Sequence, residues 1–158
     1  MSQKRILFVC LGNICRSPTA EGIMRGILER QGLASGIRLD SAGTAGYHEG
    51  SSPDPRAMEA AQRRGYRLDG QRARPVCAAD FHDFDLILGM DRANLSALEQ
   101  MRPADARARV ALLLEYTGNR ETLEVPDPYY GGSKGFERVL DLVEEACEQL
   151  ARELAGSR

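Results

Sequence analysis

Short apolar runs alternate along this chain with segments in which apolar residues recur at helical spacing. Three runs, Ile6–Cys10, Val110–Leu114 and Leu86–Leu88 with its flanks, lack the polar alternation of a strand with one wet face, and a weaker run spans Ile37–Ser41. Continuous apolar runs of this length are typical of strands buried on both faces of a parallel sheet. We therefore expect four parallel strands, one from each run.

The segments between and after these runs are predicted as amphipathic helices. The first follows Pro18 and ends at Gly32, the second spans about Pro55–Arg64, and the third spans about Arg92–Met101 with Asp91 as its N-terminal cap. The last segment carries one apolar stripe, formed by Phe136, Val139, Leu140, Val143, Cys147, Leu150, Ala151 and Leu154.

Strands that alternate with helices imply a parallel sheet joined by right-handed crossovers and covered on both faces. We predict one doubly wound α/β domain over residues 1–158, with a four-stranded parallel sheet flanked by helices in the flavodoxin-like order 2-1-3-4. A chain of 158 residues fits a single core. In such sheets ligands bind at the carboxyl ends of the strands beside the switch point, which is where the turn after the first strand lies.

The composition argues against several classes of protein. A net charge of -2 does not favour a nucleic-acid partner, and the apolar runs are far shorter than the roughly 20 residues of a membrane span. The start of the chain also lacks the apolar core of an export signal, so we expect a cytoplasmic protein without a membrane partner. Four cysteines are too few for a disulfide scaffold, and two histidines leave little material for a metal site.

Residues 8–18, with the sequence FVCLGNICRSP, place a thiol at the end of the first strand and an arginine six residues later. The free N–H groups of the following loop and of a helix that begins at Ser17 or Pro18 would converge on an anion, and Gly12 lets the backbone curl closely. Helix N-termini and a nearby arginine favour a thiolate, so we expect Cys10 to be an ionised nucleophile. Arg16 can present two parallel N–H groups to two oxygens of a phosphate.

Alternative kinds of loop account for less of this stretch. A nucleotide-triphosphate loop needs Gly-Lys before its Ser or Thr, and a dinucleotide fingerprint needs three glycines where this loop has one. Cys10 and Cys15 could form half of a metal site, but the sequence has no partner pair. An inert buried thiol would explain Cys10 alone, without accounting for Arg16 and Ser17.

The stretch VCLGNICRSPTAE closely resembles the phosphate-binding loop of low-molecular-weight protein tyrosine phosphatases. The resemblance extends over nearly the whole chain through DSAGT at 40–44, PDPRA at 53–57, DLILGMDRANL at 85–95 and DPYYGG at 127–132. It implies that Cys10 is the nucleophile, Arg16 the clamp of the transition state and Asp127 the general acid.

The resemblance also implies roles for residues around this triplet. The phosphate-binding loop comprises Leu11, Gly12, Asn13, Ile14, Cys15 and Ser17 as well. Among these, Asn13 and Ser17 hold the loop and bond the thiolate, with Ser41 as a further member of the polar network, and Cys15 is the redox partner that closes a protective disulfide onto the nucleophile.

Asp127 lies between Pro126 and Pro128, which restrict the backbone on either side of it. Without its context this would be an ordinary surface turn. The family resemblance makes it the acid at the mouth of a cleft walled by Tyr47, His48, Tyr129 and Tyr130, and aromatic walls suit the flat ring of a phosphotyrosine.

The function implied is that of a protein-tyrosine phosphatase that works through a cysteinyl-phosphate intermediate, with no metal and no cofactor. We expect its substrate to be a tyrosine-phosphorylated protein or a small aryl phosphate, inorganic phosphate to inhibit it as product, and the chain to be a monomer. The sequence departs from the family at Gln71, where many relatives carry a histidine that supports the loop. Glutamine can still donate and accept hydrogen bonds.

Two further functions are compatible with the same loop. A thiol-relay arsenate reductase would need two further cysteines a few residues apart, but Phe84 stands seven residues after Cys77 and the next cysteine is Cys147. A phosphopeptide binder without activity would not need the acid and nucleophile that this chain has kept. The phosphatase is therefore the main prediction, with the arsenate reductase as the alternative.

Overall fold

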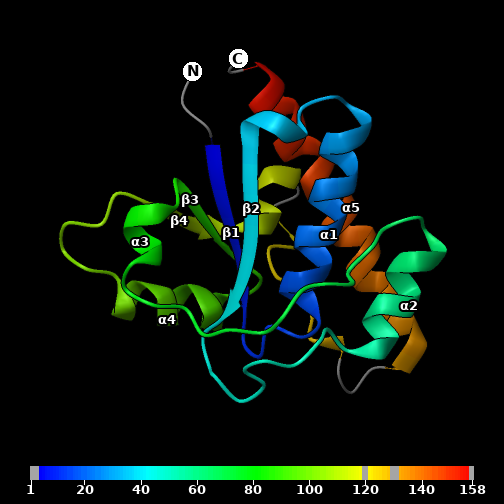
Figure 1. Ribbon diagram of the computed structural model, residues 1–158, viewed down its shortest axis with the longest axis horizontal. Helices are drawn as coiled ribbons and strands as arrows, with labels where there is room; N and C mark the ends of the chain where they lie inside the picture. The colour runs from blue at the N-terminus through cyan, green and yellow to red at the C-terminus, as the bar shows by residue number, and fades with distance from the viewer. Residues whose placement is uncertain (1–3, 119–120, 129–131, 157–158) are drawn as a thin grey trace.

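A computed structural model describes residues 4–118, 121–128 and 132–156 of the chain. Its four strands are all parallel and lie in the order β2-β1-β3-β4, which confirms the predicted sheet (Figure 1). The strands are β1 (Lys4–Cys10), β2 (Ile37–Gly43), β3 (Leu86–Gly89) and β4 (Arg109–Leu112).

The pairing register brings the carboxyl ends of the strands to one edge of the sheet. Cys10, the last residue of β1, lies opposite Gly43, the last residue of β2, and Val9 lies opposite Gly89, the last residue of β3. The loops that follow these strands therefore meet at the lower end of the molecule in Figure 1, far from the start of β1. This is the edge at which doubly wound sheets bind their ligands.

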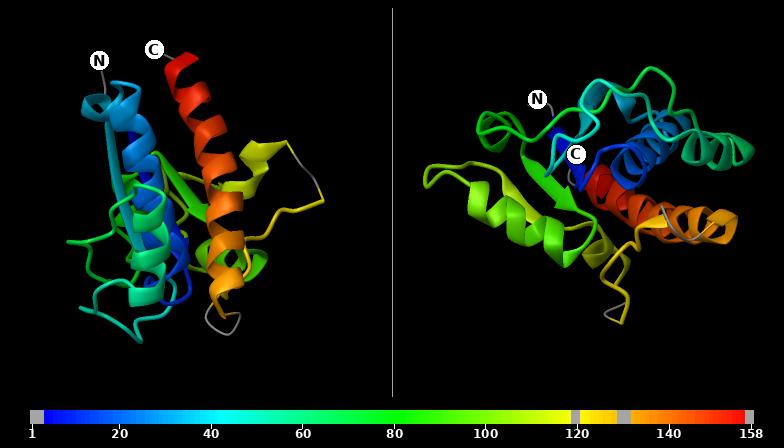
Figure 2. Two further views of the ribbon diagram at one scale, coloured as in Figure 1. Left: turned by 90° about the vertical axis from the view of Figure 1, so that its right-hand side faces the viewer. Right: turned by 90° about the horizontal axis from the view of Figure 1, so that it is seen from below.

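Helices cover both faces of the sheet. The helices are α1 (Arg16–Arg30), α2 (Pro55–Arg63), α3 (Asp80–Asp83), α4 (Arg92–Met101) and α5 (Gly132–Gly156), with two 3₁₀ turns, η1 (Ala34–Gly36) and η2 (Leu113–Thr117). Figure 2 shows α1 and α5 side by side on one face, with α3 and α4 on the other.

The side chains of β1 explain why this strand is apolar throughout. Ile6 and Phe8 belong to the core cluster that includes residues of α1 and α5, whereas Leu7 and Val9 belong to a second cluster with Phe81 of α3. Successive residues of a strand point to opposite faces, so a central strand covered by helices on both sides must be apolar at every position.

One predicted strand was wrong over its last two residues. The run Val110–Leu114 was expected to be a strand, but β4 ends at Leu112 and the chain turns into η2, where Leu113 and Leu114 are buried. The carboxylate of Glu115 accepts a hydrogen bond from the N–H of Leu112 at 2.7 Å, which helps the turn to form. These two leucines are apolar because they pack in the core cluster that includes residues of α1 and α5. Such packing needs apolar side chains whether the backbone forms a strand or a turn.

The remaining boundaries differ little from the prediction. Helix α1 begins at Arg16, slightly before the expected Ser17 or Pro18, and α2 ends at Arg63. The short helix α3 was not expected. Within the three described ranges, no helix combines the length and apolarity needed to cross a membrane.

Candidate active site

The loop between β1 and α1 wraps around the sulfur of Cys10. The thiol is buried, and the backbone N–H of Asn13 lies 3.3 Å from Sγ and points at it. Asn13 adopts a left-handed conformation with φ of 57°, which turns the chain tightly enough for this contact. Helix α1 starts directly afterwards with Pro18 in its first turn, where a missing N–H costs nothing.

A buried polar network supports this loop from below. The hydroxyl of Ser17 lies 3.0 Å from the Cys10 sulfur, and the side-chain amide of Asn13 donates to Ser17 Oγ at 2.8 Å and to Ser41 Oγ at 3.0 Å. Ser41 in turn contacts Gln71 Oε1 at 3.3 Å, and Gln71 Nε2 donates to the carbonyl of Pro18 at 3.0 Å. The structure thus brings together Cys10, Asn13, Ser17 and Ser41. Gln71 connects this network back to helix α1.

Arg16 is held over the mouth of the loop by groups from two other segments. Its side chain is only 4% exposed, and Nη1 donates to Asp91 Oδ2 at 2.6 Å and to the carbonyl of Val125 at 3.1 Å. The second nitrogen, Nη2, lies 3.7 Å from Asp127 Oδ2. Burial alone would lower the pKa of Arg16, but the negative charges of Cys10, Asp91 and Asp127 outweigh it and raise the pKa, so the guanidinium is always charged.

Asp91 is a functional residue that the sequence reasoning missed, because it was predicted only as a helix cap. It does cap α4, since Oδ1 accepts the backbone N–H of Asn94 at 2.8 Å, but Oδ2 bonds Arg16. Its position just beyond β3, which ends at Gly89, puts it at the same sheet edge as the loop, and this was the available signal.

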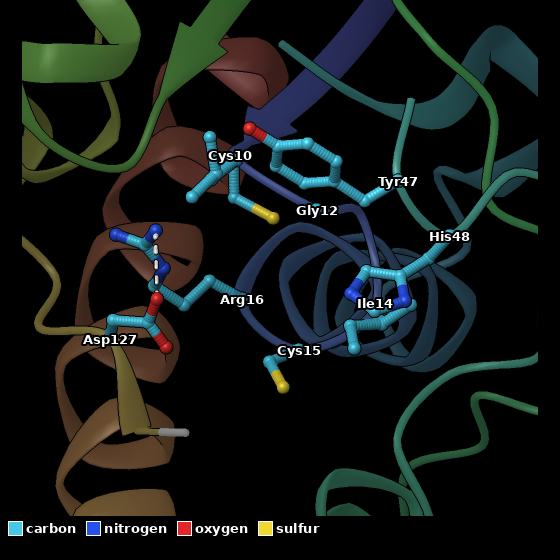
Figure 3. Close-up of a pocket in the computed structure, with 9 residues that line it drawn as sticks. Cys10, Gly12, Ile14, Cys15, Arg16, Tyr47, His48 and Asp127 are labelled. Atoms are coloured by element: carbon cyan, nitrogen blue, oxygen red, sulfur yellow. Dashed lines mark ion pairs between the residues drawn. The ribbon is translucent and has the colours of Figure 1, made fainter. Parts of the chain in front are cut away.

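The loop and its neighbours line a cavity of about 310 Å³. Its lining residues are Cys10, Leu11, Gly12, Ile14, Cys15, Arg16, Tyr47, His48 and Asp127. Figure 3 shows Arg16 and Asp127 facing each other on one side, with Tyr47 and His48 on the other and the Cys10 sulfur between them.

Two of the four residues predicted to wall the cleft, Tyr47 and His48, line this cavity. Tyr47 is 78% exposed and forms an aromatic rim, while the His48 ring lies so close to Gly12 that a side chain there would meet it at 3.0 Å. The predicted wall residues Tyr129 and Tyr130 lie outside the described residues.

Cys15 also reaches this cavity, as a free thiol. Burial, followed by the negative charges of Asp54, Cys10 and Asp127, raises the pKa of Cys15 to about 12, so this thiol stays protonated at neutral pH. Across the described part of the chain, no group of three or more His, Cys, Asp or Glu residues could hold a metal ion.

The arrangement can bind a tetrahedral anion and transfer its central atom to sulfur. The loop N–H groups and Arg16 can donate hydrogen bonds to negatively charged oxygens, Cys10 can act as a nucleophile, and Asp127 can exchange a proton at the open side.

Comparisons with known proteins agree with this geometry. Residues 5–158 match the family model described as low molecular weight phosphotyrosine protein phosphatase. The chain is 43% identical to the low molecular weight protein-tyrosine-phosphatase YfkJ of Bacillus subtilis over 92% of each protein, and 44% identical to the low molecular weight protein-tyrosine-phosphatase of Streptomyces coelicolor over 92% of this chain and 90% of the other. A crystal structure of protein tyrosine phosphatase from Entamoeba histolytica superimposes with a TM-score of 0.93 at 42% identity, covering 98% of this chain and 99% of that one.

Proposed function

This chain belongs to the low molecular weight phosphotyrosine protein phosphatase family, and from that premise we propose that Cys10 is its nucleophile, Arg16 its phosphate clamp and Asp127 its general acid. The chain is a protein-tyrosine phosphatase of the cysteine-nucleophile type. The observation that carries the assignment is the position of the Cys10 sulfur, which lies 3.0 Å from the Ser17 hydroxyl and 3.3 Å from the Asn13 N–H, in the same cavity as Arg16 and Asp127.

In the first step the Cys10 thiolate attacks phosphorus in line with the bond to the phenolic oxygen. The sulfur–phosphorus bond forms as the phosphorus–oxygen bond breaks, and Asp127, protonated at this stage, gives its proton to the departing oxygen. The products are the free tyrosine and a cysteinyl-phosphate.

In the second step Asp127, now a carboxylate, takes a proton from a water molecule that attacks the same phosphorus. The sulfur–phosphorus bond breaks, inorganic phosphate leaves, and the Cys10 thiolate is restored. Throughout both steps Arg16 and the loop N–H groups neutralise the three equatorial oxygens, which is the main catalytic task in phosphoryl transfer.

Further parts of the proposal concern the setting of the reaction. The substrate is a tyrosine-phosphorylated protein or a small aryl phosphate, inorganic phosphate inhibits as product, and no metal or cofactor takes part. Residues 1–158 act as one domain, as a monomer in the cytoplasm, and Cys15 can close a disulfide onto Cys10. The open rim at Tyr47, which leaves room for a bulky phosphoprotein, supports the choice of substrate.

The alternative, a thiol-relay arsenate reductase, is not favoured. Cys77 is exposed, but no cysteine follows it before Cys147, which is fully buried, so a disulfide has no route outward. The relatives from Bacillus subtilis and Streptomyces coelicolor are phosphatases by name.

The nucleophile is tested by Cys10→Ser, with Cys77→Ser as the matched control because Cys77 is exposed and outside the cavity. We expect Cys10→Ser to reduce hydrolysis of a phosphotyrosine peptide to background, and Cys77→Ser to leave it unchanged. Full activity of folded Cys10→Ser would overturn the assignment.

A further inference from the structure

A segment that the mechanism does not use, residues 72–76, lies against the phosphate-binding loop. The N–H of Gly43, at the carboxyl end of β2, donates to the carbonyl of Arg74, and the N–H of Val76 donates back to the carbonyl of Gly43, each at 2.8 Å. This pairing extends the sheet edge by one short stretch. It leaves the N–H of Arg74 directed toward the loop, where it donates to Asn13 Oδ1 at 3.0 Å.

This single bond determines which way the Asn13 amide faces. A backbone N–H can only donate, so Oδ1 must face Arg74 and Nδ2 must face the hydroxyls of Ser17 and Ser41. In the flipped orientation, two N–H donors would oppose each other and the serine hydroxyls would turn toward the Asn13 oxygen. The N–H of Arg74 therefore excludes the flipped amide.

The orientation of Asn13 in turn determines the direction in which the Ser17 hydroxyl donates its hydrogen bond. Because Ser17 Oγ receives a hydrogen bond from Asn13, its own proton is available to an acceptor, and the two candidates are the Cys10 sulfur at 3.0 Å and the carbonyl of Ala42 at 3.4 Å. The shorter contact directs the hydroxyl hydrogen of Ser17 toward the sulfur, to which Ser17 donates a hydrogen bond, and a hydrogen bond to an ionised acceptor is the stronger kind. Ser41 likewise directs its proton away from Asn13, to Gln71.

The side chain of Arg74 anchors the segment that carries this N–H. Its two terminal nitrogens each lie 3.0 Å from one oxygen of Asp80, and Nη2 also lies 3.1 Å from Asp40 Oδ2. Asp80 is almost fully buried and also accepts the N–H of Cys77 at 2.9 Å, so the anchor itself is fixed. A two-pronged bond between arginine and carboxylate constrains direction as well as distance.

We infer that Arg74, held by Asp80, is a positioning residue for the nucleophile: it sets the donor direction of the chain of hydrogen bonds from Asn13 through Ser17 to Cys10. The inference rests on the proposed role of Cys10. It assigns to an ion pair outside the cavity a share in stabilising the thiolate inside it.

The experiment measures alkylation of Cys10 by iodoacetate between pH 5 and 9, followed by mass spectrometry of the peptide that contains Cys10. The variants are Arg74→Met, Arg74→Lys and Asp80→Asn, and the matched control is Arg72→Met, since Arg72 is exposed and its guanidinium donates to the carbonyl of the adjacent Gln71. The other titratable groups around the sulfur, Cys15, Arg16, His48 and Asp127, are the same in every variant.

At pH 6 we expect Cys10 in Arg74→Met and Asp80→Asn to react about tenfold more slowly than in the native chain, which is the size of effect of one hydrogen bond to a charged group. The difference should vanish at alkaline pH, where the thiol ionises in every variant. Arg74→Lys should recover part of the rate, and Arg72→Met should match the native chain. The double variant Arg74→Met, Asp80→Asn should be no slower than either single one, because both remove the same anchor.

A native alkylation rate in folded Asp80→Asn would overturn the inference, even if Arg74→Met fails to fold. An equal loss of alkylation rate in Arg72→Met would overturn it too, because removal of any nearby positive charge would then have the same effect. A failure of the proposed nucleophile looks different, since Cys10 would then be unreactive in the native chain itself and Cys10→Ser would keep its activity.

Discussion

One oxygen of Asp91 lies 2.6 Å from Nη1 of Arg16 while the other caps helix α4. The same carboxylate thus caps the helix that follows β3 and orients the Arg16 guanidinium that lies over the thiol. Because α4 packs against the sheet, its cap Asp91 holds the guanidinium in a position that the fold determines, and not the loop alone.

Asp91→Asn separates these two tasks, because asparagine still caps a helix but cannot form the ion pair. We expect kcat/KM for p-nitrophenyl phosphate to fall about 10- to 100-fold, since a displaced clamp costs rate even when every reacting group is present. Steady-state kinetics and circular dichroism check this. Asp69→Asn, which breaks an exposed ion pair with Arg67, is the control, and equal kinetics in the two variants would show that Asp91 does not aim the clamp.

Asp127→Ala should affect substrates according to their leaving groups. With phosphotyrosine, whose phenol is a poor leaving group, we expect kcat/KM, which reports the first step alone, to fall about 10²- to 10⁴-fold, because a positioned acid contributes that much. With p-nitrophenyl phosphate the loss should be smaller, since p-nitrophenolate leaves without a proton. Asp105→Ala, at an exposed site paired with His82, serves as the control. Equal losses on both substrates would contradict the acid role.

Gly43→Ala tests how closely β2 approaches the phosphate-binding loop. A Cβ at Gly43 would lie 2.7 Å from the carbonyl oxygen of Leu11 and 3.0 Å from that of Ala45, so backbone must move. We expect a loss of about 1–3 kcal/mol in the free energy of unfolding, as for other overpacked sites, together with weaker inhibition by phosphate. Gly46→Ala, where the nearest atom is 3.9 Å from the new Cβ, should change neither quantity, and urea unfolding with inhibition assays distinguishes them.

Cys15 should make the fold sensitive to alkali. Burial and the charge of Asp54 raise the pKa of Cys15 from its ordinary 9.0 to about 12, so the folded state holds this proton more tightly than the unfolded state. The resulting stability is fully present below pH 9 and is lost as the pH rises toward about 12. We expect the free energy of unfolding of Cys15→Ala to fall less steeply between pH 9 and 11 than that of the native chain. Parallel curves from urea titrations would contradict this; Cys147, whose pKa burial also raises, contributes to the slope of both proteins.

The sheet could be predicted from the sequence because the period of apolar residues is a local property. Continuous stretches of sequence indicate each element: the strands buried on both faces, the long amphipathic helix at 136–154 and the turn motif after Cys10. The order of these elements along the chain leaves few possible topologies. Packing was not predictable in the same way. Leu113 and Leu114 look the same in a strand as in η2, because both structures bury them.

The site was predictable where a motif is contiguous and not where contacts join remote segments. The loop residues from Cys10 to Ser17 follow one another, so their assembly followed from the motif. The contacts of Arg16 with Asp91, and of Asn13 with Arg74, join residues 75 and 61 positions apart. Asp91 and Arg74 are ordinary charged residues within their own segments, and only the folded arrangement of these segments shows that both reach the loop.

The confinement of Arg16 has a consequence for the kinetics of association. An arginine side chain that makes no contacts on a protein surface loses roughly 2 kcal/mol of rotamer entropy when a ligand immobilises it. Here the contacts with Asp91 and Val125 already restrict the side chain before any ligand arrives, so that loss occurs during folding and not during capture. Oxyanions should therefore bind at a rate set by diffusional encounter, without a slow rearrangement of the receptor.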